Sequence, residues 1–512
     1  MSDVFDVLVI GGGPAGYSAA LHASRSDYRI ALVEERELGG TCLNRGCIPT
    51  KAYLDTAGIL RSLGDAEKRG IDFAGADPGN FGVSMKRILA FKQRIVKKMS
   101  AGVAVLLRES GVRLLRGKAS LSIGHDDLFH IPVEGSDAGE WTAKKVVLAT
   151  GSLPAVPQIG GTDAPETASR ILTSDSILEI DFIPKKLAII GGGVIGIEMG
   201  RIFHAFGSEV HIIEAMPAIA PFLDDEIGKT LAETLRGDGI RITTNAGVAH
   251  ISFDSSRENA ENSKNSGNSL PLELALTDGT TIDASHVLVA AGRVPDRRIT
   301  AHLGLDEYGS AGFVQTDWEM KTSKRGLFAA GDLNGKCMLA HAAIKMGRLA
   351  AQAAMQELAG ADPIDFRHFV GCRECFPNQV EHFFTCYTPV CIYGEPEIGY
   401  IGLTEAVARE YFGDRVTVGR FPFAANGRAV AGGHRTGFAK VVRDSGNDRI
   451  LGVHIIGPGA SELINEASLA LYAGLGSDQW SAAVHGHPTF GETLLEAVAD
   501  SWGGSIHLPK KR

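Results

Sequence analysis

The sequence predicts an α/β protein that contains two copies of one strand–turn–helix–strand unit. The copies occupy residues 5–34 and 186–214. Each begins with a short apolar strand, passes through a G-x-G-x-x-G turn into a helix, and ends its second strand at a glutamate, Glu34 or Glu214. Both glutamates lie 18 positions after the last glycine of their turn (16 to 34 and 196 to 214). Chance does not easily supply the same order and the same spacing twice.

The glycines of the two turns predict two Rossmann-like dinucleotide-binding sites. The first glycine makes the tight turn, the second lets the backbone approach a pyrophosphate at the helix N-terminus, and the third lets helix and strand pack closely. The glutamate can bind ribose hydroxyls. The residues concerned are Gly11, Gly13, Gly16 and Glu34 in the first unit, and Gly191, Gly193, Gly196 and Glu214 in the second.

Two such sites on one chain imply two different dinucleotides in electronic contact. A flavin and a nicotinamide are the natural pair, because hydride passes from one to the other. Glu214 would repel a 2′-phosphate and accept hydrogen bonds from a free 2′-hydroxyl, and residues 215–226 contain no Lys or Arg. We therefore expect the nicotinamide cofactor to be NAD rather than NADP.

Length and composition exclude several classes of protein. The 512 residues suggest about three or four domains, and the formal net charge of -9 gives no reason to expect nucleic acid binding. No apolar run approaches the roughly 20 residues that span a bilayer. The first strand follows Met1 almost at once, which leaves no room for a signal peptide, so we expect a cytoplasmic location. Seven cysteines, an odd number, do not suggest a disulfide scaffold.

Cys42 and Cys47, separated by four residues, follow the first unit closely. Such a pair can close into a small disulfide ring and open again. Pro49 and Thr50 favour the first turn of a helix, where unpaired N–H groups and the helix dipole lower a thiol pKa. An isolated pair of this spacing is more often structural, but the neighbouring dinucleotide unit favours a redox pair.

With these motifs the sequence resembles the flavin-dependent pyridine nucleotide–disulfide oxidoreductases (class I), and within them the dihydrolipoyl dehydrogenases, over nearly its whole length. The block 39–51, which contains both cysteines, carries the resemblance most specifically. The resemblance implies FAD in the first unit, NAD in the second, and a C-terminal α+β dimerisation domain. The implied domains are 1–152 (FAD, first part), 153–285 (NAD), 286–357 (central, FAD second part) and 358–512 (dimerisation).

By resemblance, Cys47 is the thiol nearest the flavin and Cys42 exchanges with the substrate. Lys51 would lie near the flavin and pair with Glu198, although outside this context both would be taken for solvated helix charges. Further FAD contacts are implied at Thr41, Lys51, Gly117, Thr150, Gly151, Ser152, Asp332, Met338, Leu339, Ala340 and His341, and a further NAD contact at Gly292.

The segment 485–492 resembles the His-x-His-Pro-Thr-x-x-Glu motif of the same enzymes. It implies that His487 is a general base oriented by Glu492, and that it reaches the disulfide of the other subunit of a homodimer. An isolated histidine would more often be structural. The implied reaction is ping-pong: a dihydrolipoyl thiol attacks Cys42, and electrons then pass through Cys47 and FAD to NAD+. The implied partner is the lipoyl domain of a 2-oxo acid dehydrogenase or glycine-cleavage complex.

Three segments depart from the family pattern. The first, 254–269, is polar and of low complexity and predicts a long hairpin loop in the NAD domain with no evident chemistry. About eighteen extra residues between 365 and 388 carry Cys372, Cys375 and Cys386, with Cys391 just beyond. A metal site, a second redox pair and ordinary thiols are all open interpretations; we favour ordinary thiols and expect no metal. The segment 393–397 replaces the family's usual His-Pro-Glu stretch, which puts the interface near the substrate channel in doubt.

Two other functions stay open. A reductase of an unusual disulfide is compatible with the altered interface, whereas glutathione-type reductases normally use NADP, against Glu214. A redox sensor without catalysis is a less favoured alternative, because sensing requires no substrate base such as His487.

Overall fold

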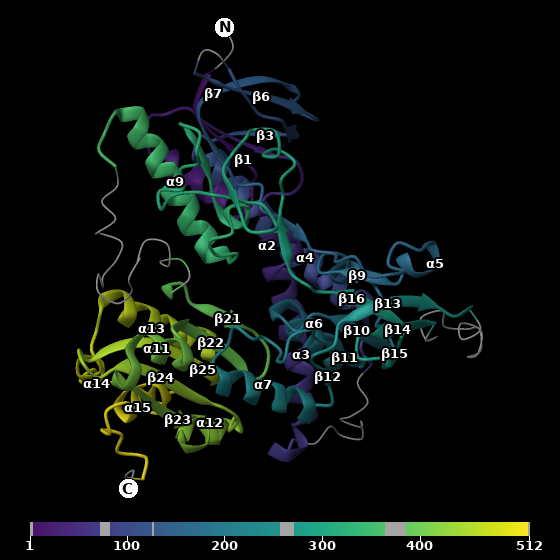
Figure 1. The fold of residues 1–512 in the computed structure, drawn as a ribbon, viewed down its shortest axis with the longest axis vertical. Helices are drawn as coiled ribbons and strands as arrows, with labels where there is room; N and C mark the ends of the chain where they lie inside the picture. The colour runs from purple at the N-terminus through teal and green to yellow at the C-terminus, as the bar shows by residue number, and fades with distance from the viewer. Residues whose placement is uncertain are drawn as a thin grey trace.

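The computed structural model describes residues 4–71, 82–124, 127–255, 271–363, 384 and 386–509. Most of the predicted loop 254–269 lies outside these residues. Figure 1 shows the N-terminal nucleotide-binding unit at the top, the second unit at the lower right and the C-terminal domain at the lower left. The predicted fold class, two Rossmann-like units with a C-terminal α+β region, is confirmed.

The first unit is built on a sheet with the strand order β3-β2-β1-β7-β6-β4, in which β20 also pairs with β7 and β5 with β6. Its core strands β1, β2, β3, β7 and β20 are parallel, as expected for strands linked by helical crossovers. The strands are β1 (Val4–Ile10), β2 (Ile30–Glu34), β3 (Arg113–Arg116), β4 (Lys118–Ala119), β5 (Ser122–Ile123), β6 (Phe129–Glu134), β7 (Gly139–Leu148) and β20 (Leu327–Ala329).

The described part of the chain contains five helices that belong to the first unit. Helix α1 (Pro14–Ala23) begins directly after the first glycine-rich turn and packs against α9 (Ala340–Ala359). The remaining helices are α2 (Gly40–Arg45), α3 (Cys47–Gly64) and α4 (Met85–Glu109). The predicted helix after the cysteine pair is therefore present, with Cys47 as its first residue.

The second unit repeats the design with the all-parallel order β12-β11-β10-β16-β9. Its elements are β9 (Ile171–Thr173), β10 (Lys186–Ile190), α6 (Val194–Ala205), β11 (Glu209–Ile213), α7 (Asp225–Gly237), β12 (Arg241–Thr243) and β16 (His286–Val289), with the short helix α5 (Pro165–Ala168) and the antiparallel sheet β13 (Val248–Phe253), β14 (Leu272–Leu276) and β15 (Thr281–Ala284). Strand β16 pairs with β10 in this sheet and directly follows residue 285.

The two units are joined by a pair of short antiparallel strands, β8 (Ser152–Pro154) and β17 (Arg293–Pro295). One strand leaves the first sheet and the other returns from the second. A further two-stranded sheet consists of β18 (Glu307–Tyr308) and β19 (Phe313–Val314). These crossings bring the carboxyl ends of β1 and β10 to the same region of the molecule, where ligands of open α/β sheets bind.

The C-terminal domain is an antiparallel sheet with the order β21-β22-β25-β24-β23, packed against helices α13 and α15. Its elements are β21 (Val390–Ile392), β22 (Glu397–Gly402), α11 (Glu405–Phe412), β23 (Val416–Pro422), α12 (Gly427–Gly432), β24 (Phe438–Asp444), β25 (Arg449–Gly457), α13 (Ala460–Ala473), α14 (Ser477–Ser481) and α15 (Gly491–Asp500). In the part of the chain that the structure describes, no helix is both long and apolar enough to cross a membrane.

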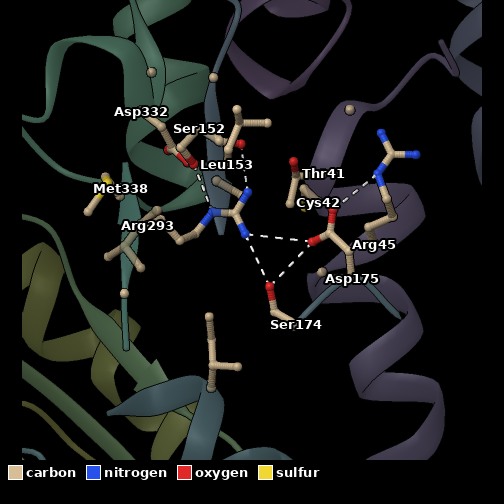
Figure 2. A pocket seen from close by; sticks show the side chains of 18 of the residues that line it. Thr41, Cys42, Arg45, Ser152, Leu153, Ser174, Asp175, Arg293, Asp332 and Met338 are labelled. Carbon is tan, nitrogen blue, oxygen red and sulfur yellow. Dashed lines mark hydrogen bonds and ion pairs between the residues drawn. The ribbon is translucent and has the colours of Figure 1, made fainter. Parts of the chain in front are cut away.

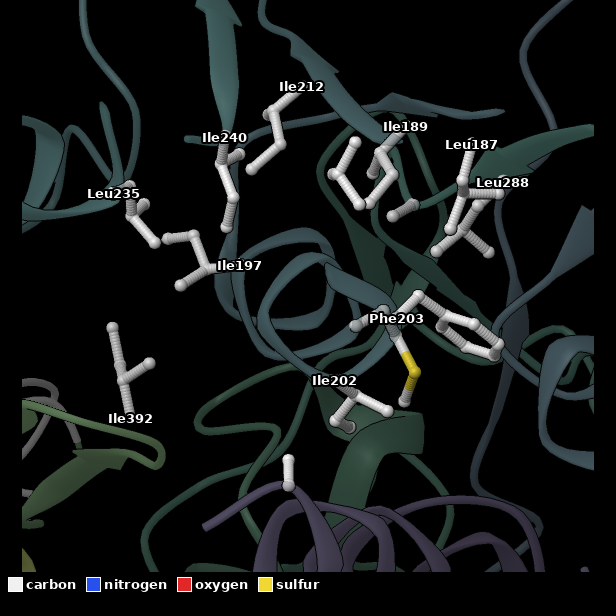
Figure 3. Packing of buried hydrophobic residues seen from close by; sticks show 14 of the residues in the cluster. Leu187, Ile189, Ile197, Ile202, Phe203, Ile212, Leu235, Ile240, Leu288 and Ile392 are labelled. Carbon is white, nitrogen blue, oxygen red and sulfur yellow. The ribbon is translucent and has the colours of Figure 1, made fainter. Parts of the chain in front are cut away.

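A buried hydrophobic cluster connects the second unit to its neighbours (Figure 3). It contains Ile189 and Ile212 of the sheet, Ile197 and Ile202 of α6, and Ile392 of β21. Each of these side chains is at most 2% exposed. Because close-packed side chains leave little freedom, this cluster places the end of β21 at a fixed position against helix α6.

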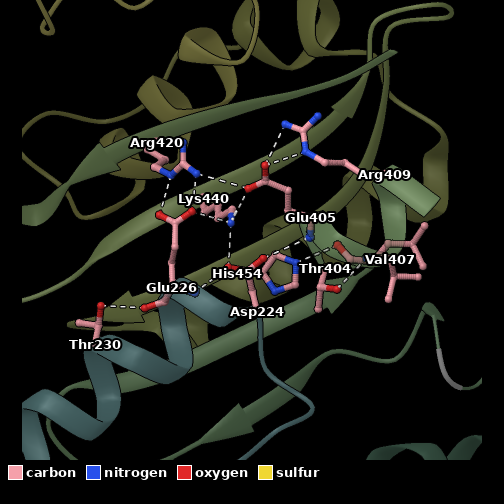
Figure 4. A network of polar contacts seen from close by, with 11 residues as sticks. Asp224, Glu226, Thr230, Thr404, Glu405, Val407, Arg409, Arg420, Lys440 and His454 are labelled. Carbon is pink, nitrogen blue, oxygen red and sulfur yellow. Dashed lines mark hydrogen bonds and ion pairs between the residues drawn. The ribbon is translucent and has the colours of Figure 1, made fainter. Parts of the chain in front are cut away.

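An ion-pair network holds the second unit to the C-terminal domain (Figure 4). Lys440 Nζ lies 2.8 Å from Asp224 Oδ1, 2.9 Å from Glu226 Oε1 and 2.8 Å from Glu405 Oε2. Arg420 also binds Glu226, with its Nε 2.7 Å from Oε2. The side chains of Lys440 and Asp224 are each 2% exposed, so their charges depend on each other rather than on water.

Loss of the Lys440 ammonium is expected to destabilise the contact between these domains. Lys440→Met leaves Asp224 buried without its cation, so the free energy of unfolding should fall by about 3 kcal/mol, measured by chemical denaturation. Arg409 provides a matched control because it pairs with Glu405 from a side chain that is 47% exposed. Arg409→Met should cost less than about 1 kcal/mol; equal losses for the two variants would contradict the assigned role of Lys440.

The same network predicts a loss of stability in acid. The hydrogen bond from Arg420 and the charge of Lys440 lower the pKa of Glu226 to about 2 from its usual 4.5, against the effect of burial. The unfolded chain therefore binds more protons, and stability falls as the pH falls through the range between these two values. Glu226→Gln should flatten this dependence in unfolding midpoints measured from pH 5 to 2.5. The exposed Glu410 is the control: Glu410→Gln should keep the wild-type slope.

Candidate active site

A single cavity of about 1650 Å³ reaches both glycine-rich turns. Its volume exceeds the roughly 300–1,000 Å³ of an ordinary small-molecule pocket, which suits two dinucleotides. Every cofactor residue predicted from the sequence lines this cavity except Gly16 and Gly196. Those two glycines are the third of their turns, for which close packing and not ligand contact is the predicted role.

The first and third glycines of each turn are required by the fold itself. A Cβ on Gly11 would lie 2.3 Å from the Ala149 carbonyl oxygen, and one on Gly16 would lie 1.8 Å from the Gly11 carbonyl oxygen. Gly191 and Gly196 repeat these contacts at 2.4 and 2.0 Å. No larger residue fits at these four positions, because no real Cβ approaches a backbone atom so closely.

The middle glycines differ, because their surroundings are open. Among the described residues, the nearest atom to a Cβ on Gly13 would be the Gly40 Cα at 3.8 Å, and a Cβ on Gly193 would meet nothing within 4 Å. Both glycines line the cavity at the N-terminus of a helix, α1 or α6. The space there is free for a pyrophosphate, as the motif predicts, and the residues present therefore fit a dinucleotide in each unit.

The two glutamates hold the turns in place. Glu34 Oε2 accepts from the Gly12 N–H at 2.5 Å, and Glu214 Oε2 accepts from the Gly192 N–H at 2.7 Å. The other carboxylate oxygens accept from the N–H groups of Arg36 and Met216. Each oxygen can accept more than one hydrogen bond, so ribose binding is compatible with these backbone contacts, which the motif alone does not predict.

The cysteine pair spans a helix break in the wall of the cavity. Cys42 lies in α2 and Cys47 begins α3, and both are free thiols. A hydrogen bond from Cys42 and the charge of Lys51 lower the pKa of Cys47 to about 7, against burial and the charge of Glu198. The same bond and burial raise the pKa of Cys42. The reduced pair therefore keeps its proton on Cys42 and its charge on Cys47.

Lys51 and Glu198 form the predicted pair. Lys51 Nζ lies 3.1 Å from Glu198 Oε1 and 3.0 Å from Oε2. The Lys51 side chain is 32% exposed and that of Glu198 only 5%. Lys51 follows Cys47 by one helical turn, which places both on the same face of α3. The ion pair thus joins helix α3 of the first unit to helix α6 of the second beside the thiols.

A polar cluster crosses the middle of the cavity (Figure 2). Ser152 Oγ donates to Asp332 Oδ2 at 2.5 Å, and Arg293 Nε donates to Ser152 Oγ at 2.8 Å. Arg293 also lies 3.8 Å from Asp175. Ser152 and Asp332 were predicted as flavin contacts, whereas Arg293 and Asp175 were not. Arg293 directly follows Gly292, which is a predicted NAD contact. This neighbouring position is the feature of the sequence that could have identified Arg293 as a cavity residue.

The remaining predicted cofactor residues line the same cavity. Gly117 and Gly292 have φ values of 159° and 114°. A Cβ added to Gly292 would meet no atom of the described residues within 4 Å. His341 Nε2 bonds the Pro389 carbonyl oxygen at 2.8 Å, and burial lowers its pKa. The others are Thr41, Thr150, Gly151, Met338, Leu339 and Ala340.

His487 and Glu492 form a pair elsewhere in the molecule. His487 Nδ1 lies 2.8 Å from Glu492 Oε1, and the His487 side chain is 78% exposed. Burial acts to raise the pKa of Glu492, but the hydrogen bond with His487 helps to lower it below its usual value, which favours the ionised carboxylate. Neither residue lines the cavity that contains Cys42 and Cys47. Within one chain, the predicted base and the predicted disulfide are therefore not brought together.

The additional cysteines do not gather around a common point in the described structure. Cys386 is buried in a cluster with Leu403 and Ala408, and Cys391 packs on a different cluster and lines the cavity. Cys372 and Cys375 lie outside the described residues. Among the residues that the structure describes, no group of three or more His, Cys, Asp or Glu side chains could hold a metal ion.

Comparison with known proteins agrees with this arrangement. Residues 5–347 match the family model described as pyridine nucleotide-disulphide oxidoreductase, and residues 388–498 match the dimerisation domain of the same family. A dihydrolipoyl dehydrogenase of Thermus scotoductus is 36% identical over 98% of this chain and 99% of its own. One of Chlamydia muridarum is 34% identical over the full length of both chains.

Solved structures support the fold. LpdA of Mycobacterium tuberculosis aligns with a TM-score of 0.80 at 24% identity, covering 97% of this chain and 99% of its own. The HOCl-induced flavoprotein disulfide reductase RclA of Escherichia coli aligns over the same shares with a TM-score of 0.76. The two glycine-rich units, the cysteine pair in the shared cavity and the matched C-terminal domain lead to one conclusion: the chain belongs to the pyridine nucleotide-disulphide oxidoreductase family.

Proposed function

We propose that the protein is a dihydrolipoyl dehydrogenase, which oxidises protein-bound dihydrolipoyl groups with FAD in the first unit and NAD in the second. The observation that carries the proposal is one cavity that contains Cys42, Cys47, Lys51 and both glycine-rich turns. Full-length relatives with this name, at 34% and 36% identity, support the choice of substrate.

The chain's own groups account for the thiol chemistry. His487 of the partner subunit takes the proton of one substrate thiol, and the resulting thiolate attacks Cys42 Sγ. The Cys42–Cys47 bond breaks, and Cys47 leaves as a thiolate because its pKa is lowered to about 7. The second substrate thiol then attacks the substrate sulfur of the mixed disulfide, and its proton passes to the departing Cys42 sulfur. This releases the oxidised substrate and leaves Cys42 protonated and Cys47 as the thiolate.

The remaining residues hold the products of this step. Lys51 places a positive charge near the Cys47 thiolate, and the Cys42 thiol donates a hydrogen bond to it. When bound, the flavin and the nicotinamide supply the onward transfer of the electron pair. Glu214 and the absence of Lys and Arg from residues 215–226 favour NAD over NADP in that transfer.

The homodimer is part of the proposal. The dimerisation-domain match supports two subunits, and the His487–Glu492 pair needs a second chain to reach a cysteine pair, since neither residue lines the cavity of its own chain. The partner would be a lipoyl domain of a 2-oxo acid dehydrogenase or glycine-cleavage complex. The cytoplasmic location and the expected domain boundaries stay predictions.

Turnover with free dihydrolipoamide tests the function. The purified enzyme should form NADH from NAD+, and NADP+ should support at least about 100-fold lower kcat/KM, because Glu214 repels a 2′-phosphate. The same protein with NADPH and a panel of disulfides provides the comparison. Disulfide reduction without dihydrolipoamide oxidation would favour the alternative, a reductase of another disulfide; bound flavin without either activity would favour a redox sensor.

Mixed dimers test the shared site. Cys42→Ser and His487→Gln homodimers should each lose at least about 100-fold in kcat. When the two variants are co-expressed, half of the dimers are mixed and each contains one intact pair of Cys42 and His487. About a quarter of wild-type activity should therefore return. His130→Gln on β6, outside the cavity, is the control for a histidine substitution. No recovery in isolated mixed dimers would place the base and the disulfide in the same chain.

A further inference from the structure

Tyr393 contacts both members of the ion pair beside the thiols. Lys51 Nζ lies 4.2 Å from the centre of the Tyr393 ring, within the range of a cation–π interaction. The Tyr393 backbone N–H donates to Glu198 Oε1 at 3.0 Å. Burial raises the pKa of the Tyr393 hydroxyl to about 12, so the ring stays neutral. One residue thus fixes the carboxylate by its backbone and the ammonium by its ring.

The position of Tyr393 is set by helix α6 on one side of it. Ile392, its neighbour in the chain, is fully buried in the same cluster as Ile197 and Ile202 (Figure 3). Glu198, whose oxygen receives the Tyr393 N–H, directly follows Ile197. The helix therefore holds Tyr393 through packing at one residue and through a hydrogen bond at the next.

Arg201 of the same helix holds the turn after Tyr393. Its Nη1 donates to the Pro396 carbonyl oxygen at 2.8 Å and to the Tyr393 carbonyl oxygen at 3.5 Å. Gly394 leaves the room for this side chain, because a Cβ there would lie 2.8 Å from Arg201 Cδ. Its φ of 119° also favours glycine.

Burial of the Arg201 guanidinium at this position costs free energy. The residue is 6% exposed, its Nε and Nη2 have no hydrogen-bond partner among the described residues, and burial lowers its pKa to about 10. Taking a cation out of water is expensive, and the charges of Asp238, Glu198 and Glu395 offset only part of this cost, because the pKa of Arg201 is still lowered. Stability of the fold alone therefore does not account for Arg201.

We propose that Tyr393 and Arg201 are positioning residues that hold the Lys51–Glu198 pair so that the Lys51 charge stabilises the Cys47 thiolate. Tyr393 contacts the pair directly, and Arg201 acts through the turn 393–396. The inference rests on the proposed role of Cys47 as the thiolate of the pair. It does not depend on the identity of the substrate.

The charged and titratable groups around Cys47 come from four helices. They are Tyr17 on α1, Cys42 on α2, Lys51 on α3 and Glu198 on α6. Cys42 and Lys51 favour the Cys47 thiolate, and Glu198 disfavours it. A ring that keeps Lys51 in place therefore preserves a balance of opposite charges, and loss of the ring lets the ammonium move into solvent. The Cys47 pKa should then rise.

The test measures the Cys47 pKa in the FAD-loaded enzyme. All variants carry Cys42→Ser, so that Cys47 is the only thiol of the pair and a hydroxyl that can donate to it remains. The rate of Cys47 alkylation by iodoacetamide is followed by peptide mass spectrometry from pH 5 to 10. Tyr393→Leu should shift the profile upward by about half a unit to one unit, whereas Tyr393→Phe, which keeps the ring, should retain the parent profile.

Arg201→Met separates positioning from simple packing. It keeps apolar volume but removes the donors to the turn, so in folded protein it should shift the profile in the same direction as Tyr393→Leu. Tyr393→Met serves in place of Tyr393→Leu if that variant does not fold. An unchanged profile in Arg201→Met and in the folded Tyr393 aliphatic variant would overturn the proposal. Absence of dihydrolipoamide turnover in the enzyme that keeps both Cys42 and Cys47, together with a shifted profile in the Cys42→Ser variants, would overturn the proposed function alone.

Discussion

The ion pair between Lys51 and Glu198 is the contact on which the redox centre depends. It joins helices α3 and α6, which belong to different nucleotide-binding units, at a point beside the cysteine pair. Glu198 is almost fully buried, and a buried carboxylate requires a compensating charge. The pair therefore ties the two units together and sets the electrostatic surroundings of Cys47 with the same two side chains.

The backbone geometry of the glycine-rich turns places this pair. Gly196 brings α6 so close to its strand that a Cβ would meet the Gly191 carbonyl oxygen at 2.0 Å. Helix α6 thus starts at a fixed distance from β10, and Glu198 projects from its first turns. The glycines of this turn therefore have two roles. The middle glycine leaves space for a ligand, and the outer two fix helix α6, which carries Glu198.

The sequence predicts best those features whose causes are local. The two strand–turn–helix units, the helix that starts at Cys47 and the cavity-lining glycines follow from spacing within about thirty residues. The role of Arg293 could have been inferred from its position after Gly292. The network of Asp224 and Lys440 could not, because the two residues are 216 positions apart and nothing in either neighbourhood identifies the other. The sequence distinguishes Tyr393 only as part of a segment that departs from the family pattern, because its contact with Lys51 depends on the packing of Ile392 against α6.

The two thiols show how such packing produces different chemistry from identical groups. Cys42 and Cys47 are the same residue type and both are partly buried. The pKa of Cys42 is nevertheless raised and that of Cys47 is lowered. The difference arises because Cys42 donates the hydrogen bond and Cys47, one helical turn before Lys51, receives it. Since a thiolate is the better leaving group when its pKa is low, the proposed attack on Cys42 would expel the Cys47 thiolate, which the charge of Lys51 stabilises. Helix α3, which carries both Cys47 and Lys51, therefore supports the direction proposed for the exchange.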